Sequence, residues 1–142
     1  MPAKKVKKPV APKFISAKGS RKRSTAAIWF YKTKGEFTVN GVSIEDYSKK
    51  VEDSEFWLKP FFAVGISHPK AKYSATIKVR GGGISSQDEA IIMAISRALV
   101  KMDESYKPAL RAEGFLTRDP REVERKKTSQ PKARRKSQYS KR

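Results

Sequence analysis

Three consecutive glycines, Gly81, Gly82 and Gly83, separate a predicted strand from a predicted helix, and this order suits an anion-binding loop. The N–H groups of a glycine-rich turn and of a helix N-terminus can converge on one phosphate. Arg80, immediately before the glycines, adds a positive charge. The spacing matches neither a P-loop, since no Lys-Ser/Thr pair follows, nor a dinucleotide fingerprint, since position 86 is serine. The glycines could equally serve close passage of the strand against the helix, and both interpretations stay open.

A second basic cluster, Arg21, Lys22 and Arg23, is followed by Ser24 and Thr25 and leads into the first predicted strand. Basic side chains and short hydroxyls are typical of contacts to phosphate and sugar. The alternative is a charged strand entry that faces solvent.

The C-terminal stretch holds a third set of basic side chains, in which acids are interspersed only at the beginning. The early mixed charges could form local ion pairs within a helical turn. The later, acid-free part has no local electrostatic reason for a fixed shape and needs a partner of opposite charge. The cations expected to contact phosphate are Arg118, Arg121, Arg125, Lys126, Lys127, Lys132, Arg134, Arg135 and Lys136.

The charge of the whole chain supports this interpretation. Its 142 residues include 33 basic and 14 acidic side chains, which gives a net charge of +19 and a pI of about 10.3. Residues 1–25 hold nine basic groups and no acid, and residues 117–142 hold eleven basic and three acidic groups, so residues 26–116 are nearly neutral. A surplus of this size favours a polyanion, most often nucleic acid. Two solubilising tails are the alternative.

Several classes of function are excluded or disfavoured. The chain has no cysteine and a single histidine, His68, which rules out disulfides, thiolate metal sites and Cys/His nucleophilic pairs. No apolar run approaches the roughly twenty residues that cross a bilayer, and the N-terminus lacks a signal-peptide core. We therefore expect no cofactor, no metal, no small-molecule substrate and no membrane partner. An RNA-modifying enzyme with an acidic site at Asp88 and Glu89 is a remote alternative.

The elements that would position these residues are four strands and a main helix. Residues 24–32 and 36–40 are expected to form a hairpin around Lys34-Gly35, and residues 61–66 and 73–79 a second pair of strands. Ser86 and Glu89 have the spacing of a capping box. Apolar residues at helical spacing from Ile91 to Met102 then predict one helix face.

The predicted fold class is therefore α+β, a layer of about four strands packed against one main helix. Shorter helices are expected over residues 43–51 and 107–113. The aromatic residues of the neutral middle are expected in the core, with stacking on nucleic-acid bases as the alternative. The predicted organisation is a disordered basic extension over residues 1–18, a globular domain over 19–116 and an extended basic tail over 117–142.

Six segments taken together resemble the family of small-subunit ribosomal protein nine, in its bacterial and organellar form. The resemblance covers residues 19–142, and its last two segments are the most specific. The segments are G-S-R-K-R-S-T-A from Gly19, F-T-V-N-G from Phe37, V-R-G-G-G from Val79, S-R-A-L from Ser96, G-F-L-T-R-D-P-R-E-V-E-R-K-K from Gly114 and K-A-R-R-K-S-Q-Y-S-K-R from Lys132.

The resemblance implies the fold of the second domain of ribosomal protein five and a role in binding ribosomal RNA in the small-subunit head, beside other head proteins. It implies a tail that reaches the anticodon stem-loop of peptidyl-site tRNA, a contact that falls on Lys141 and Arg142, with Gln138 and Tyr139 on ribosomal RNA. The implied location is the small ribosomal subunit of a bacterial cytoplasm or an organelle. A free-standing RNA-binding or chaperone protein is the alternative.

The chain departs from the family pattern at four positions. The family usually has arginine where Ser20 and Ala27 stand, which puts one or two phosphate contacts in doubt, and glycine where Ser86 and Ser129 stand. Because serine can cap a helix, we expect the turn at Ser86 to survive with a shifted helix start.

Overall fold

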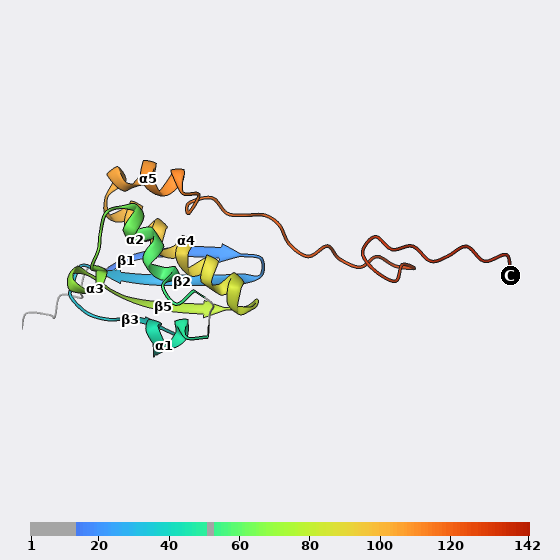
Figure 1. Ribbon diagram of the computed structural model, residues 1–142, viewed down its shortest axis with the longest axis horizontal. Coiled ribbons are helices and arrows are strands. Elements are labelled where there is room, and N and C mark those ends of the chain that lie inside the picture. The colour runs from blue at the N-terminus through green and yellow to red at the C-terminus, as the bar shows by residue number, and fades with distance from the viewer. Residues whose placement is uncertain (1–13, 51–52) are drawn as a thin grey trace, which may run out of the picture.

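The architecture of the computed structural model is a five-stranded sheet with helices over one face and a long C-terminal tail (Figure 1). The structure describes residues 14–50 and 53–142. The spatial order of the strands is β1-β2-β5-β3-β4. Their bounds are β1 Phe14–Arg21, β2 Ser24–Tyr31, β3 Phe37–Val39, β4 Val42–Ser43 and β5 Ser74–Arg80. The α+β class is thus confirmed, with a fifth strand.

The pairing of the strands corrects two expectations. β2 is antiparallel to β1 on one side and to β5 on the other, so no edge of β2 is free for β3. β3 instead runs parallel to β5, and the hairpin predicted between residues 24–32 and 36–40 is wrong. Disorder over residues 14–18 is also wrong, because β1 pairs with β2 along its whole length, from Phe14 opposite Tyr31 to Arg21 opposite Ser24. The rest of that extension, residues 1–13, lies outside the described residues.

One long helix, α4 (Ile84–Met102), covers the sheet and buries the apolar face predicted for residues 91–102. The short helices predicted near residues 43–51 and 107–113 are confirmed as α1 and α5. The remaining bounds are α1 Ile44–Ser48, η1 Phe56–Leu58, α2 Lys59–Ala63, α3 Pro69–Lys72, η2 Glu104–Tyr106 and α5 Lys107–Ala112, where η marks a 3₁₀ helix. No helix within the described parts of the chain is long and apolar enough to span a membrane.

The strand predicted over residues 61–66 is wrong, because residues 59–63 form α2. Pro60 stands in the first turn of this helix, the one place where a helix accepts proline without loss. Phe61 is fully buried and lies 5.7 Å from Phe37 and 6.3 Å from Phe30, between ring centroids. The expected aromatic core is therefore present in part and draws on helices as well as strands, whereas Phe62 is exposed and Trp29 and Tyr31 are only partly buried.

The two faces of the sheet differ in composition. In β2 the side chains of Ala26, Ile28 and Phe30 are buried under the helices, while Ala27 and Trp29 alternate with them and point to the opposite face. That opposite face, which we call the open face, carries the even-numbered residues of β1 and β5 and the odd-numbered residues of β2. The tail from Thr117 onward contains neither helix nor strand and runs away from the domain (Figure 1).

Candidate nucleic-acid interface

The β1–β2 turn and the glycine loop lie at the same end of the sheet, because Arg21 is opposite Ser24 and Thr25 is opposite Arg80. The Ser24 hydroxyl joins the two segments. Its Oγ donates to the carbonyl oxygen of Gly81 at 2.9 Å and lies 2.7 Å from Ser86 Oγ. Two of the basic segments singled out in the sequence are therefore one structural unit.

Gly81 and Gly82 are required by this close packing. Their φ angles are +76° and +63°, in the left-handed region that favours glycine. A Cβ on Gly82 would lie 2.0 Å from Ser24 Oγ, and one on Gly81 would lie 2.5 Å from the Arg23 carbonyl oxygen. Close passage is therefore present at Gly81 and Gly82, but against the β1–β2 turn and not, as expected, between the strand and the helix, and Gly83 has open space around it.

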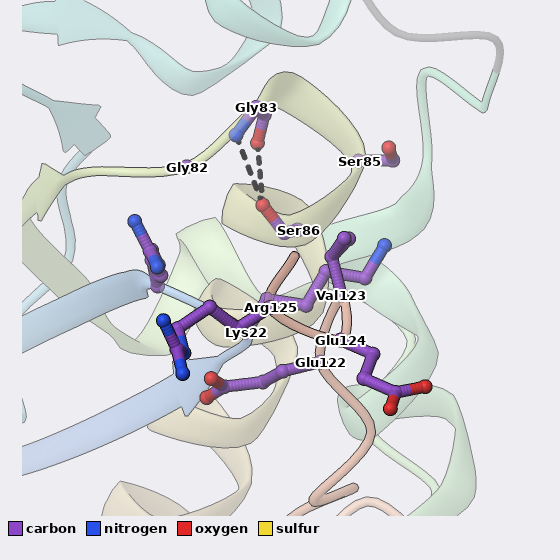
Figure 2. A pocket seen from close by; sticks show the side chains of 10 residues that line it. Lys22, Gly82, Gly83, Ser85, Ser86, Glu122, Val123, Glu124 and Arg125 are labelled. Atoms are coloured by element: carbon purple, nitrogen blue, oxygen red, sulfur yellow. Dashed lines mark hydrogen bonds between the residues drawn. The ribbon is translucent and has the colours of Figure 1, made fainter. Parts of the chain in front are cut away.

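The capping box predicted from Ser86 and Glu89 is wrong, because α4 begins two residues earlier, at Ile84. Ser86 instead lies in the first turn, where its Oγ accepts from the Gly83 N–H at 3.1 Å (Figure 2). The turn is thus present with serine at position 86, and a shift of the helix start relative to the family stays a prediction. Glu89 does not cap the helix and instead pairs with Arg21.

Arg21 fastens the beginning of the tail to the domain. Its Nε lies 2.5 Å from Glu89 Oε2, its Nη2 lies 3.2 Å from Asp119 Oδ2, and its Nη1 donates to the Arg121 carbonyl oxygen at 2.8 Å. The side chain is only 10% exposed. The N–H groups of Arg21 therefore bind partners within the protein, and a contact of Arg21 with RNA stays a prediction.

Two further contacts strengthen this attachment. Arg118 donates to Ser20 Oγ at 3.0 Å and to the Lys22 carbonyl oxygen at 3.3 Å. The serine at position 20 therefore helps to hold the tail against the domain. Hydrogen bonds from the side chain and backbone of Arg121, together with the charge of Arg21, hold the pKa of Asp119 well below its usual range. The first residues of the tail are thus held by a connected set of charges.

A cavity of about 550 Å³ lies between this tail segment and the glycine loop (Figure 2). It brings together five of the residues predicted to contact RNA: Lys22, Arg23, Gly82, Gly83 and Arg125. Glu122 and Glu124 also line it and offset part of the positive charge. The cavity joins cations, a helix N-terminus and a glycine turn, which is a combination suited to a phosphate oxygen.

The middle of the tail is folded back on itself by Glu124. This carboxylate pairs with the Lys127 ammonium and accepts from Arg134 Nε at 2.8 Å, and Lys127 also donates to the Ala133 carbonyl oxygen at 3.0 Å. Ser129, where the family usually has glycine, has a φ of +59° within this turn. The ion pairs expected in the early tail are therefore present, but the helical turn expected to hold them is wrong, because the tail from Thr117 onward contains no helix.

The remaining predicted contacts are exposed and are not gathered into one place. Arg80 ends β5, and the others follow one another along the tail towards its end. They are Lys126, Lys132, Arg135, Lys136, Gln138, Tyr139, Lys141 and Arg142. Sequence reasoning did not identify Ser24 as the link between the β1–β2 turn and the glycine loop, nor Glu89 and Asp119 as the partners of Arg21.

The two acids of the enzymatic alternative lie in different surroundings. Glu89 is paired with Arg21, and Asp88 is buried, which raises the pKa of its carboxyl to about 6. Among the described residues no group of three His, Cys, Asp or Glu side chains is placed to hold a metal ion.

Comparison with known proteins gives a consistent result. Residues 19–142 match the model of the family described as ribosomal protein S9/S16. A small ribosomal subunit protein uS9 from Porphyromonas gingivalis is 43% identical over 129 residues, which is 91% of this chain and 98% of the relative. Proteins of the same name from Methylacidiphilum infernorum and Chlorobaculum tepidum are 43% and 42% identical over 90% of this chain, and cover 92% and 97% of the relatives.

Proposed function

Since the chain belongs to the ribosomal protein S9/S16 family, we propose that it is a structural constituent of the small ribosomal subunit that binds ribosomal RNA without catalysis. In this proposal the domain docks in the head of the subunit beside other head proteins. The tail threads between RNA segments, and its end reaches the anticodon stem-loop of peptidyl-site tRNA.

The observation that carries the proposal is the distribution of charge beyond the attachment point. Residues 125–142 hold nine basic side chains and no acid, and they extend from a base that Arg21 fixes to the domain. Acids occur in the tail only at Asp119, Glu122 and Glu124, where they pair with cations of the protein. Of the nine distal cations, Lys127 and Arg134 pair with Glu124, and the other seven have no acid partner among the residues that the structure describes and can neutralise phosphates.

Such binding is read from the salt dependence of the affinity. Each phosphate neutralised adds roughly 0.7–0.9 to the slope of log affinity against log salt concentration. RNA helices are recognised mainly by shape and backbone, so a tail without regular structure can follow an RNA surface. The entropy lost on ordering the tail is offset by counterion release during assembly.

At the end of the tail, Arg142 offers a planar fork that can hold one phosphate by two hydrogen bonds, and Lys141 adds a point charge. Deleting these two residues should leave incorporation into the small subunit intact and weaken the binding of tRNA in the peptidyl site. The matched control is the double variant Lys132→Ala/Lys136→Ala, which removes the same charge further from the end.

The assay compares reconstituted subunits that carry the intact chain, the deletion or the control variant, by filter binding of labelled tRNA. Equal tRNA affinity for the deletion and the intact chain would refute the role of the tail end. Failure of the intact chain to co-sediment with small subunits in high salt would refute the ribosomal assignment and favour a free-standing RNA-binding protein.

A further inference from the structure

The open face of the sheet contains a second cavity, of about 520 Å³, that none of the predicted contacts occupies. Its position follows from the strand register. Ala27 lies between Lys18 on β1 and Lys78 on β5, and the next row places Trp29 between Ser16 and Thr76. The small side chain of Ala27 leaves a hollow that is bordered by longer neighbours.

Two cations of α4 reach this hollow around the edge of the sheet. β1 is an edge strand, and its outward carbonyl groups need donors. Arg97 Nη1 donates to the Lys18 carbonyl oxygen at 2.8 Å, and Lys101 Nζ donates to the Ser16 carbonyl oxygen at 2.6 Å. Both side chains line the cavity and keep further N–H donors, since a guanidinium has five and an ammonium three.

The lining combines an indole with three cations. Trp29 is partly exposed, in contrast to Trp57, which is 4% exposed in the core. Lys78 Nζ lies 5.5 Å from the centroid of the Trp29 ring and adds a fourth positive charge beside it. The described lining residues include no acid, whereas Glu122 and Glu124 line the cavity at the glycine loop.

We propose that this cavity binds a nucleotide of an RNA strand, with the base against Trp29 and the flanking phosphates on Lys18, Arg97 and Lys101. The proposal rests on the ribosomal assignment above and adds an RNA contact on the face opposite the helices. Charge decides the occupant, because a surface of four cations without acid repels most basic ribosomal proteins and attracts phosphate. The ring supplies a stacking surface that accepts any base.

The first test follows the fluorescence of Trp29 in the full-length variant Trp57→Phe, whose only remaining indole is at position 29. Small-subunit ribosomal RNA transcribed in vitro is the titrant. Stacking should quench the emission in proportion to the bound fraction and should protect the ring from acrylamide. Unchanged emission at saturation would overturn the proposal, and so would protection that appears only after other ribosomal proteins are added.

The second test removes charge without altering the core. The variant Lys18→Ala/Lys101→Ala should lower the salt slope for the same RNA by about 1.4 or more, the contribution of two phosphates, and should weaken binding at least about tenfold in 0.1 M salt. The matched control Lys107→Ala/Arg111→Ala removes two exposed cations from α5, on the other side of the sheet. Equal slopes for both variants would overturn the proposal.

The two hypotheses fail in different ways. If the unaltered chain binds the RNA while Trp29 stays exposed and the Lys18→Ala/Lys101→Ala variant behaves as its control does, only the cavity proposal falls. If the unaltered chain does not bind the RNA at all, the proposed function falls and the cavity proposal falls with it. The Trp29→Leu variant, which keeps an apolar side chain, should bind more weakly than the unaltered chain, and equal affinity would count against stacking.

Discussion

Replacement of Arg21 by alanine should loosen the tail from the domain and lower the stability of the domain itself. The guanidinium is 10% exposed and contacts Glu89, Asp119 and the Arg121 carbonyl oxygen at once. Its removal breaks the contacts of β1 with Glu89 of α4 and with Asp119 and Arg121 of the tail, while the contacts of Arg118 with the β1–β2 turn remain. The lost packing of the arginine stem acts in the same direction.

The size of the effect follows from the exposure of each partner. A charged hydrogen bond to a carbonyl group contributes about 1.5–3 kcal/mol when shielded from water. The pair with Glu89 adds at most about 1 kcal/mol, because that carboxylate is 55% exposed and is rehydrated once the arginine is gone. The expected loss is therefore about 2–4 kcal/mol, at or below the 3–5 kcal/mol that follows when a buried charge is left unpaired.

Urea unfolding monitored by circular dichroism measures this loss, and hydrogen exchange of residues 117–121 reports whether the tail has detached. Arg21→Lys keeps the charge but lacks the fork, so it should lose about 1 kcal/mol less than the alanine variant does. Arg118→Ala is the control, since it removes an exposed tail arginine whose contacts are at the surface and should cost about 0.5 kcal/mol. Equal losses for Arg21→Ala and Arg118→Ala would refute the role assigned to Arg21.

Two further variants test the domain. Gly82→Ala should lower the free energy of unfolding in urea by at least about 2 kcal/mol, because its φ is +63° and a Cβ would overlap Ser24 Oγ. The control is Gly41→Ala, where a Cβ would meet open space. A loss for Gly82→Ala no larger than that for Gly41→Ala would contradict this reasoning. For Asp88, burial raises the pKa of the carboxyl in the folded state to about 6, from 3.8, so the domain should lose stability as the pH rises from about 4 to 6. Asp88→Asn should abolish this loss of stability with rising pH and should be about 1–2 kcal/mol more stable than the unaltered chain at pH 7. Urea unfolding curves measured from about pH 4 to pH 6 test this. An unchanged loss of stability in the Asp88→Asn variant would show that the reasoning is wrong.

The elements with strong periodicity were predictable from the sequence. Helix α4 follows from the spacing of Ile91, Ile95 and Ala98, since a helix places all three on one face whereas a strand would turn Ala98 to the opposite face. β1 was missed because, after Phe14 and Ile15, residues 16–21 hold only small and polar side chains and give no apolar alternation. Gly19 of β1 lies so close to α4 that a Cβ would be 2.2 Å from the Ala90 carbonyl oxygen. In the sequence such a close contact is indicated only by the presence of a glycine.

The candidate site was predictable as a set of residue types and less so as a geometry. The glycine loop and the cluster at residues 21–23 were identified separately, and their union depends on the register of β1, β2 and β5, which involves residues far apart in the chain. The inward direction of Arg21 follows from the alternation of β1, whose bounds were not known. Trp29 was assigned to the core because strand residues usually are, and only the register places it on the open face.

The position of β5 has a consequence for biosynthesis. β1 with β2, and β3 with β4, are two ribbons that share no hydrogen bonds with each other until residues 74–80 enter between them. A nascent chain that has emerged only as far as residue 73 exposes one unpaired border of each ribbon, a situation that invites association with other chains. Completion of the layer must therefore wait for the last strand to leave the exit tunnel, and a stall shortly before that point would leave an intermediate prone to aggregation.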